Sequence, residues 1–349
     1  MAEVPSYAPE QLFPFPVPAP EPPTALRGAA AERFLHPRGG ALPGERVLIT
    51  GIAGSLGRLA ARRLVGRHDV LGVDRAGWPG HPADVRMHLL DLRKRKFEDI
   101  FRTERPDAVV HHAFIRHFKG DPEARHEVNV LGTRRLLEFA AEYGVKRIVV
   151  VSSAYVYGAL PENPSFLDEE SPLNVSRTYP EIRDLAEVDQ LVMTSLWQHP
   201  EIAITLLRPV STLGPGSRSA MSRLLRQRLV PMILGFDPML QFIHEEDAAD
   251  AVALALEKGT HGVFNVTGPG AVPLSVAIRE TGGLAVPFFE PFARLLFAQL
   301  FRLGLYHTPA GAIDFLKYAC TLDGRRFREV TGFEPRHALR ETFHSLGAA

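Results

Sequence analysis

Cysteine is nearly absent from this chain, which has one, Cys320, among 349 residues. A single thiol excludes an internal disulfide and a zinc site built on several thiolates, and it fits a reducing, cytoplasmic location. A net charge is absent too, because 40 basic residues balance 40 acidic ones. A neutral chain has no overall field to attract nucleic acid or an anionic membrane. We therefore expect no nucleic-acid partner.

Long apolar runs are also missing. No stretch of about 18 uninterrupted apolar residues occurs, so we predict no transmembrane segment. The N-terminus has no cationic start followed by an apolar run, so a signal peptide is not expected. Instead, residues 1–43 are rich in proline, which removes backbone donors and favours extended polyproline II. We predict a disordered tail there, with a docking arm across the folded body as the alternative.

A strand, a glycine turn and a helix follow one another in "ERVLITGIAGSLGRLAARRLVG". Val47–Thr50 is a short, β-branched apolar run, which is typical of a buried parallel strand. Gly51, Gly54 and Gly57 come next, and the apolar residues then keep helical spacing. Without Cβ atoms the backbone can approach a pyrophosphate closely, and the free amides of a helix N-terminus bind it. This context favours a dinucleotide-binding loop over a plain tight turn.

A second predicted strand, Val70–Val73, ends in Asp74, 23 residues beyond Gly51. A carboxylate at this place can accept hydrogen bonds from the adenosine ribose. It would repel the extra phosphate of NADP, so NAD is favoured, although the adjacent Arg75 is the residue type that such a phosphate needs. An ordinary turn residue at the end of the strand is the alternative for Asp74.

Strands and helices continue to alternate, with predicted strands at Ala108–His111 and Arg147–Ser152 and a helix over "NVLGTRRLLEFAAEYG". This order predicts an α/β fold with a doubly wound parallel Rossmann sheet. His111 and His112 invite a metal interpretation. Adjacent strand residues face opposite sides, so the two imidazoles cannot share one ion, and we predict packing rather than a metal site.

A family resemblance emerges from motifs that stand in one order: "TGIAGSLG", "VLGVDR", "VVHHAF", "NVLGT", "VSSAYVYG" and "TYPEIR", followed by "LLRPVSTLGPG", "FIHEEDAADAVALAL", "GVFNVTG" and "LDGRRFREVTGFEPR". The series resembles the extended short-chain dehydrogenase/reductase superfamily, in its NAD-dependent epimerase/dehydratase branch. It implies an NAD-binding Rossmann domain at 44–209, to which 236–263 return. It also implies a smaller C-terminal substrate domain from 210–235 and 264–349. A small-molecule substrate and a homodimer are further expectations.

By position, the resemblance implies residues for the pyrophosphate, ribose, adenine and nicotinamide of the cofactor. They are Gly51, Ala53, Gly54, Ser55, Leu56, Gly57, Asp74, Arg75, Asp91, Leu92, His112, Ala113, Phe114, Asn129, Val151, Tyr179, Arg183 and Pro209. It places the following residues on the substrate side: Arg116, Ala154, Tyr155, Ser211, Arg218 and His244.

Ser153 and Tyr179 match the family's catalytic residues, and Arg183 falls where the family has lysine. Hydride transfer from a secondary alcohol needs a base for the hydroxyl proton. A free tyrosine, with a pKa near 10, becomes such a base only beside a positive charge. Tyr179 and Arg183 are one helical turn apart on one face, and Ser153 would donate to the reacting oxygen.

Arg183 is the first of three departures from the family pattern. A guanidinium keeps the charge, but its planar fork needs more room than an ammonium. The chain is therefore expected to be an active or slowed enzyme, or a pseudoenzyme that keeps the cofactor as part of a binding module. A surface arginine paired with Asp184 or Glu187 is the structural alternative.

The other departures concern the substrate. Ala154 and Tyr155 replace the acid pair of the dehydrating members, so dehydration is not expected. Ser211 replaces an asparagine, and Leu240 and Gln241 replace an arginine–aspartate pair, which removes a bidentate diphosphate clamp. Four nearby arginines could replace this clamp as phosphate ligands, or they could simply form a solvated helix face. They are Arg218, Arg223, Arg226 and Arg228.

The expected function is an NAD-dependent oxidoreductase or epimerase of a secondary alcohol, with a sugar nucleotide as the leading substrate. Because the residues that would bind a diphosphate are missing, a reductase of a less polar, non-nucleotide substrate is the alternative hypothesis. The apolar segment 287–305 supports this alternative if it lines the binding site of such a substrate. A helix that packs on the substrate domain or on a partner subunit is its favoured interpretation.

Overall fold

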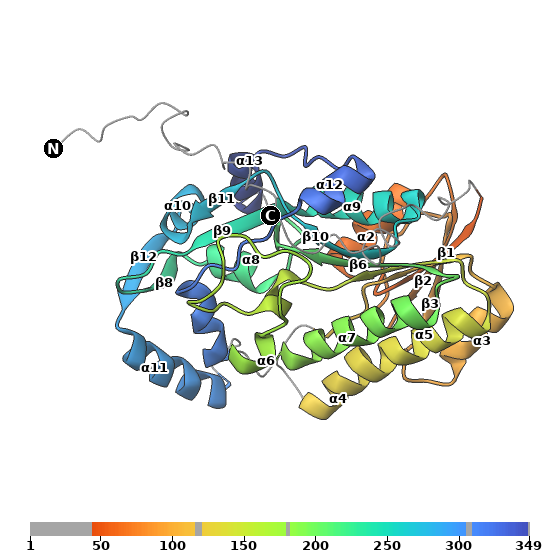
Figure 1. Ribbon diagram of the computed structural model, residues 1–349, viewed down its shortest axis with the longest axis horizontal. Coiled ribbons are helices and arrows are strands. Elements are labelled where there is room, and N and C mark those ends of the chain that lie inside the picture. The colour runs from red at the N-terminus through yellow and green to blue at the C-terminus, as the bar shows by residue number, and fades with distance from the viewer. Residues whose placement is uncertain (1–43, 116–120, 179–181, 305–308, 348–349) are drawn as a thin grey trace.

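The computed structural model describes residues 44–115, 121–178, 182–304 and 309–347 (Figure 1). The predicted N-terminal tail, residues 1–43, lies outside this range. So do Arg116 and Tyr179, two of the predicted site residues. Among the described residues, no helix is both long enough and apolar enough to span a bilayer.

Seven parallel strands form the central sheet, in the order β10-β6-β5-β4-β1-β2-β3. Their short apolar runs are buried between two helical layers, which explains why they show little apolar–polar alternation. The doubly wound Rossmann sheet predicted from the sequence is confirmed. The strands are β1 (Arg46–Thr50), β2 (Asp69–Asp74), β3 (Val85–Leu89), β4 (Ala108–His111), β5 (Arg147–Val151), β6 (Ala203–Pro209) and β10 (Gly262–Val266).

Helices cover both faces of this sheet (Figure 1). Val47 and Ile49 face the layer of α2 and α9, whereas Leu48 faces the layer of α3, α5 and α7. The helices are α2 (Ser55–Leu64), α9 (Glu245–Lys258), α12 (Arg325–Thr331), α3 (Lys96–Glu104), α4 (Pro122–His126), a π-helix (Glu127–Leu131), α5 (Gly132–Glu142), α6 (Val175–Thr178) and α7 (Arg183–Gln198).

Segments after Pro209 build two smaller sheets, β11-β9-β7 and β12-β8, around a core of their own. The predicted helix in segment 287–305 is α11, which turns Ala293 and Phe297 into that core and leaves Phe292 and Leu295 exposed. The elements are β7 (Ser211–Leu213), α8 (Ala220–Leu225), β8 (Leu229–Ile233), β9 (Met239–His244), β11 (Ala271–Pro273), α10 (Leu274–Glu280), β12 (Leu284–Phe288), α11 (Glu290–Arg302), α13 (Leu339–His344) and two 3₁₀-helices, Ala310–Leu316 and Ser345–Gly347. A further 3₁₀-helix, Ala154–Tyr157, follows β5.

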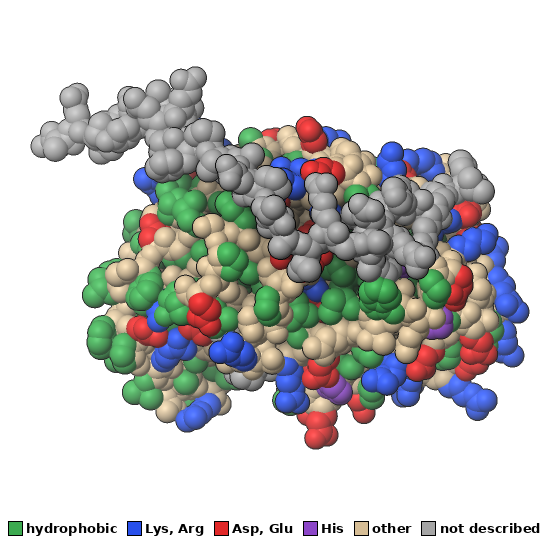
Figure 2. Space-filling model, in the orientation of Figure 1, with side chains coloured by type: hydrophobic (Ala, Val, Ile, Leu, Met, Phe, Trp, Pro, Cys, Tyr) green, Lys and Arg blue, Asp and Glu red, His purple; other side chains and the backbone are tan. Residues whose placement is uncertain are grey.

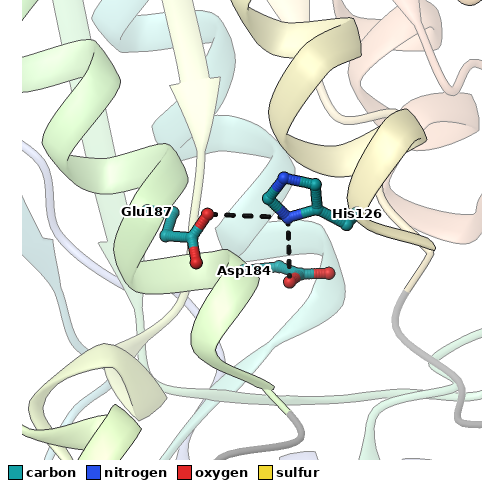
Figure 3. Close-up of side chains that lie close together, drawn as sticks. All are labelled: His126, Asp184 and Glu187. Atoms are coloured by element: carbon teal, nitrogen blue, oxygen red, sulfur yellow. Dashed lines mark ion pairs between the residues drawn. The ribbon is translucent and has the colours of Figure 1, made fainter. Parts of the chain in front are cut away.

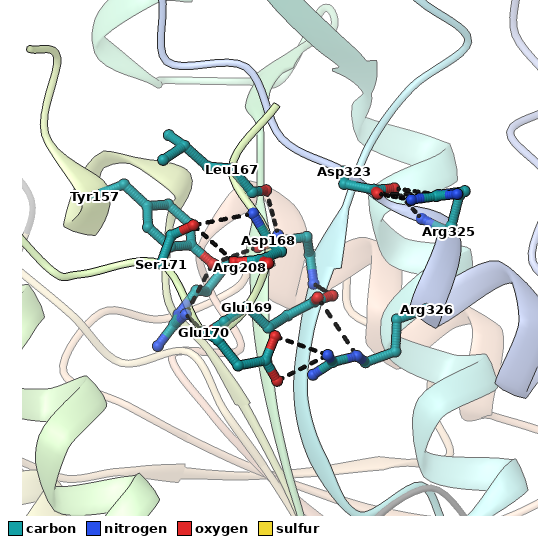
Figure 4. Close-up of polar contacts among 11 residues, drawn as sticks. Tyr157, Leu167, Asp168, Glu169, Glu170, Ser171, Arg208, Asp323, Arg325 and Arg326 are labelled. Carbon is teal, nitrogen blue, oxygen red and sulfur yellow. Dashed lines mark hydrogen bonds and ion pairs between the residues drawn. The ribbon is translucent and has the colours of Figure 1, made fainter. Parts of the chain in front are cut away.

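A buried ion pair joins two strands to a helix beneath the carboxyl edge of the sheet. Arg208 of β6 donates through Nε to Asp189 Oδ2 of α7, at 2.7 Å, and both side chains are fully buried. Ser152, which follows β5, donates to the other oxygen of Asp189. Arg208 also donates to the Tyr157 hydroxyl at 2.8 Å and to the Glu169 carbonyl at 3.1 Å (Figure 4).

Glu169 extends this network toward the C-terminal segments (Figure 4). Its Oε1 accepts from the Asn265 amide of β10 at 2.8 Å, and its Oε2 lies 3.5 Å from Arg326 Nε of α12. Burial raises the pKa of Glu169 to about 7, and Arg326 opposes that rise only in part. The carboxyl group is therefore expected to be largely protonated below this pH and ionised above it.

Replacing Glu169 by Gln should change how the free energy of unfolding depends on pH. The folded-state pKa, about 7, lies above the ordinary 4.5, so folding favours the protonated group. Stability from this group is complete below the unfolded pKa and is lost as pH rises through the folded one. In urea titrations from about pH 5 to about pH 8, the wild type should lose stability relative to Glu169→Gln. A difference that grows in favour of the wild type at high pH would contradict this.

Candidate active site

The glycine loop between β1 and α2 is shaped by close backbone contacts. Gly51 has a φ of +75°, and a Cβ there would lie 2.7 Å from the backbone carbonyl of His112. A Cβ on Gly57 would lie 2.3 Å from the Gly51 carbonyl oxygen. On Gly54 it would meet only that oxygen, at 3.2 Å. Gly51 therefore lets the loop pack against the segment after β4, and Gly57 lets the first turn of α2 pack against the backbone of Gly51 and Ile52.

The N-terminus of α2 faces out of this loop without a side-chain cap. Gly54 is the N-cap residue, and the first turn carries no acidic residue. The first amides of a helix lack intrahelical acceptors and carry the positive end of its dipole. The amides of Ser55, Leu56 and Gly57 are thus suited to an anion. An approachable glycine backbone beside them fits the pyrophosphate of a dinucleotide.

Asp74 stands at the end of β2, beside the glycine loop. Its Oδ2 accepts from the Ala53 amide at 3.0 Å, and its Oδ1 accepts from the Ala76 amide at 2.9 Å. A carboxylate has about four lone-pair sites, so it can still accept from ribose hydroxyls. The side chain is therefore both a clasp for the loop and a candidate ribose ligand.

Asp91 lies at the same edge and is held by arginines. Arg93 donates to both of its oxygens, and these hydrogen bonds hold the pKa of Asp91 below its usual range. Arg75 Nε lies 3.7 Å from Asp91 Oδ2. The neighbouring Leu92 is buried against the sheet. The structure thus gathers the predicted adenosine-side residues at the carboxyl ends of β2 and β3.

The segment after β4 is fixed by Asn129, which lies in the π-helix Glu127–Leu131 and is almost fully buried. Its carbonyl oxygen accepts from the Ile115 amide at 2.8 Å, and its amide donates to the Ile115 carbonyl at 3.1 Å. Ala113 and Phe114 pack against the adjoining core. Asn129 therefore shapes the wall along which the resemblance places the cofactor.

His111 is a packed core residue. Its Nδ1 lies 2.6 Å from Thr50 Oγ1, and its Nε2 lies 2.9 Å from Thr133 Oγ1. Burial lowers the pKa of His111 to about 3, so the ring is neutral at physiological pH. Two hydroxyl partners and complete burial explain a histidine here without a metal ion.

Ser153 follows β5 at the carboxyl edge, two residues after Val151. Its Oγ accepts from the Tyr155 amide at 3.3 Å and caps the 3₁₀-helix Ala154–Tyr157. Because this hydroxyl is an acceptor in the cap, its proton remains available for a second oxygen. Pro209, the last residue of the adjacent strand β6, ends at the same edge.

Arg183 is the first residue of α7, and its side chain is 65% exposed. Its Nε lies 3.9 Å from Glu187 Oε1, which confirms one of the two surface pairs considered above. The other pair is wrong, because Asp184 is held by Arg125, with Nε 3.3 Å from its Oδ2. An exposed pair at 3.9 Å contributes little, so the guanidinium can turn toward a ligand at small cost.

A small cavity opens beside Ser153. Its volume is about 20 Å³, which is room for about one water molecule. The Tyr155 hydroxyl lies 3.2 Å from Ser211 Oγ, and its ring meets Phe315 edge-on at 4.6 Å between centroids. Burial raises the pKa of Tyr155, so this phenol stays neutral. The cavity is lined by Ala154, Tyr155, Val210, Ser211, Met221, Leu240, Gln241, Phe315 and Cys320.

The lining residues that were not predicted as site residues include Met221, Phe315 and Cys320. They come from distant segments and belong to no motif. Burial raises the pKa of Cys320 to about 12, so its thiol is unreactive at neutral pH. Its Sγ donates to the Ala154 carbonyl at 3.6 Å. The only sequence signal for this contact was the residue type of Cys320, because a free cysteine is usually buried.

Gln241 and Arg226 are both committed to the backbone. Gln241 accepts from the Leu322 amide at 2.7 Å and donates to the Leu322 carbonyl at 3.1 Å. Arg226 donates to the carbonyls of Gly214, Pro215 and Ser217. Arg226 is therefore a loop staple and not a free phosphate ligand. Of the other candidates, Arg218, Arg223 and Arg228 are exposed.

His244 is buried at the N-terminus of α9, where its Nδ1 accepts from the Glu246 amide at 3.2 Å. Its ring stacks on that of His337, with centroids 3.9 Å apart. Burial, followed by the neighbouring His337, lowers the pKa of His244. The ring is thus a helix cap, and it does not line the cavity beside Ser153.

Comparison with known proteins shows the family of this chain. Residues 47–267 match the model of the NAD dependent epimerase/dehydratase family. An uncharacterised protein of Mycobacterium tuberculosis is 31% identical over 314 residues, which cover 85% of this chain and 82% of that protein. A 3-diazoavenalumate denitrifying reductase of Streptomyces is 31% identical over 243 residues, 65% of this chain and 77% of the reductase.

Solved structures show the same fold. MoeE5 in complex with UDP-glucuronic acid and NAD superposes with a TM-score of 0.69 at 24% identity, covering 86% of this chain and 97% of MoeE5. DesIV, a dTDP-glucose 4,6-dehydratase from Streptomyces venezuelae with NAD and TYD bound, superposes with a TM-score of 0.68 at 20% identity, covering 86% and 96%.

Replacing Gly57 by Ala should weaken binding of NAD. The new Cβ would press on the Gly51 carbonyl and the Ile52 backbone and displace the loop. Isothermal titration should show an affinity loss of at least about tenfold, or about 1.4 kcal/mol. Gly270→Ala is the control, because its Cβ would meet only Leu339 Cδ1 at 3.8 Å. Equal affinities of the two variants would contradict the assigned loop.

Proposed function

Because this chain belongs to the NAD-dependent epimerase/dehydratase family, we propose that it oxidises or epimerises a secondary alcohol with NAD(H). The observation that carries the proposal is convergence at one edge of the sheet. The uncapped α2 terminus, Asp74, Ser153 and the cavity all lie at the carboxyl ends of parallel strands. In open α/β sheets, ligands bind at that edge.

The residues of this edge fit NAD(H), which supplies a hydride acceptor or donor when bound. Gly51, Gly54 and Gly57 would hold the pyrophosphate with the first amides of α2. Asp74 would accept from the adenosine ribose, and its negative charge disfavours the phosphate of NADP. Further contacts would come from residues on the adenine side and along the walls, namely Ala53, Ser55, Leu56, Arg75, Asp91, Leu92, His112, Ala113, Phe114, Asn129, Val151 and Pro209.

We assign the proton transfer to Ser153, Tyr179 and Arg183. Ser153 would donate a hydrogen bond to the substrate oxygen, since its own acceptor role is taken by the Tyr155 amide. Tyr179 would take or return the hydroxyl proton. Arg183 would favour its phenolate through charge, since within the described part of the chain its exposed guanidinium is paired only with Glu187, at 3.9 Å.

A sugar nucleotide is the leading substrate in this proposal, supported by the fold neighbour MoeE5, which holds UDP-glucuronic acid and NAD. A second candidate is a less polar ketone or alcohol. Its support is the cavity wall, where Phe315, Met221 and Leu240 predominate, together with the commitment of Gln241 and Arg226 to backbone groups. The similarity to a reductase of a non-sugar compound points the same way. Dehydration is not proposed, because Ala154 and Tyr155 offer no acid pair.

The same proposal includes the division of labour along the chain. Residues 44–209 and 236–263 would bind the cofactor, and 210–235 and 264–349 would bind the substrate. The latter contribute most of a separate core, which includes Phe297 and Phe343 and supports this division, although Phe242 of β9 joins that core from segment 236–263. A cytoplasmic location and a homodimer complete the proposal.

Tyr179→Phe should abolish most turnover without weakening NAD binding. Loss of a positioned acid–base group costs about 10²- to 10⁴-fold. The assay follows NADH absorbance and product formation on a panel of sugar nucleotides and of apolar secondary alcohols and ketones. Unchanged turnover in Tyr179→Phe would contradict the enzymatic proposal. NAD binding with no turnover on any substrate would favour the binding module.

Arg183→Lys is the second change, four residues along the chain from Tyr179. It keeps the positive charge but replaces the planar fork with a compact ammonium. Turnover should rise if the guanidinium limits activation of Tyr179. A fall of turnover to the level of an uncharged Arg183→Met variant would show that the site depends on the guanidinium shape, contrary to this expectation.

A further inference from the structure

A histidine and two carboxylates converge where α4 meets the first turns of α7 (Figure 3). His126 Nδ1 lies 3.6 Å from Asp184 Oδ1 and 3.5 Å from Glu187 Oε2. All three ligand atoms lie within 4.8 Å of one another. The proposed reaction uses none of these three side chains.

Arginines flank the cluster but occupy the other oxygen of each carboxylate. Arg125 Nε is 3.3 Å from Asp184 Oδ2, and Arg183 Nε is 3.9 Å from Glu187 Oε1. Asp184 Oδ1 and Glu187 Oε2 are therefore the oxygens nearest the imidazole. Because the Asp184 side chain is only 4% exposed, its orientation is set by packing.

The separations do not suit direct hydrogen bonds. An N–H···O hydrogen bond spans about 2.7–3.2 Å, and both imidazole distances exceed it. His126 Nδ1 is a buried atom without a hydrogen-bond partner among the described residues. Bonds of about 2.0–2.2 Å from a tetrahedral zinc ion place neighbouring ligand atoms about 3.3–3.6 Å apart. The two distances from the imidazole nitrogen to the carboxylate oxygens thus match two edges of such a coordination shell.

We propose that His126, Asp184 and Glu187 bind a divalent transition-metal ion of the zinc class, with solvent as the fourth ligand. One imidazole nitrogen and two carboxylate oxygens form a donor set that such ions accept. The ion links α4 to α7. Since α4 continues into the π-helix of Asn129, and α7 begins at Arg183, this metal link fixes two walls of the candidate active site relative to each other.

The experiment uses the full chain, freed of metal with a chelator and titrated calorimetrically with zinc chloride. The wild type should bind zinc with micromolar or tighter affinity. His126→Ala should lose this binding, and Glu187→Gln should weaken it by at least about tenfold. His199→Ala is the control. His199 Nδ1 lies 3.3 Å from one carboxylate, that of Glu201, whereas His126 faces two, so this change removes a histidine–carboxylate pair outside the proposed site. Zinc should raise the melting temperature of the wild type and of this control only.

Metal-free unfolding curves establish that each variant is folded before titration, and Glu187→Gln preserves shape if His126→Ala does not fold. Two results would overturn the proposal. One is no zinc binding by the folded wild type. The other is equal binding by wild type, His126→Ala and Glu187→Gln, which would place the ion elsewhere.

Discussion

The buried pair of Arg208 and Asp189 is the interaction on which the candidate site depends. Asp189 anchors α7, Arg208 belongs to β6, and Ser152 brings the end of β5 to the same carboxylate. Two charges without solvent must be paired, because an isolated buried ion costs several kcal/mol. The pair therefore fixes the relative positions of the elements that carry Ser153, Pro209 and Arg183.

The carboxyl edge above this pair collects groups of different chemistry. The α2 terminus supplies unpaired amides, Asp74 supplies a carboxylate, and Ser153 supplies a hydroxyl. Each is held by a backbone contact rather than by another functional side chain. This arrangement leaves the functional atoms free for ligands while their positions are determined by the fold, as preorganised sites require.

Sequence predicted the parts of this edge that are local. Gly51 and Asp74 stand at fixed offsets from strand ends, and the short apolar runs placed β1, β2, β4 and β5 correctly, with β5 ending at Val151 rather than Ser152. Contacts between residues of distant segments were not predicted. Nothing local pairs Asp184 with Arg125, or Gln241 with the Leu322 backbone, because such contacts arise only when separate segments fold together.

The substrate side shows the same limit in a sharper form. Arg226 sits in a run of arginines that suggested a phosphate site, yet its guanidinium closes a loop. Phe315 and Cys320 complete the cavity from the far end of the chain. A run of arginines in a sequence indicates that these side chains can bind an anion. Whether they do so depends on the backbone carbonyls nearby, to which the same guanidinium groups can donate instead.

The central claim is that the carboxyl edge of this sheet holds a nicotinamide dinucleotide. Mass spectrometry of small molecules released from the purified, denatured protein tests it most directly, before and after incubation with NAD and with NADP. The account predicts retained or acquired NAD, in preference to NADP, at up to one molecule per chain. Release of neither dinucleotide under any of these conditions would contradict it.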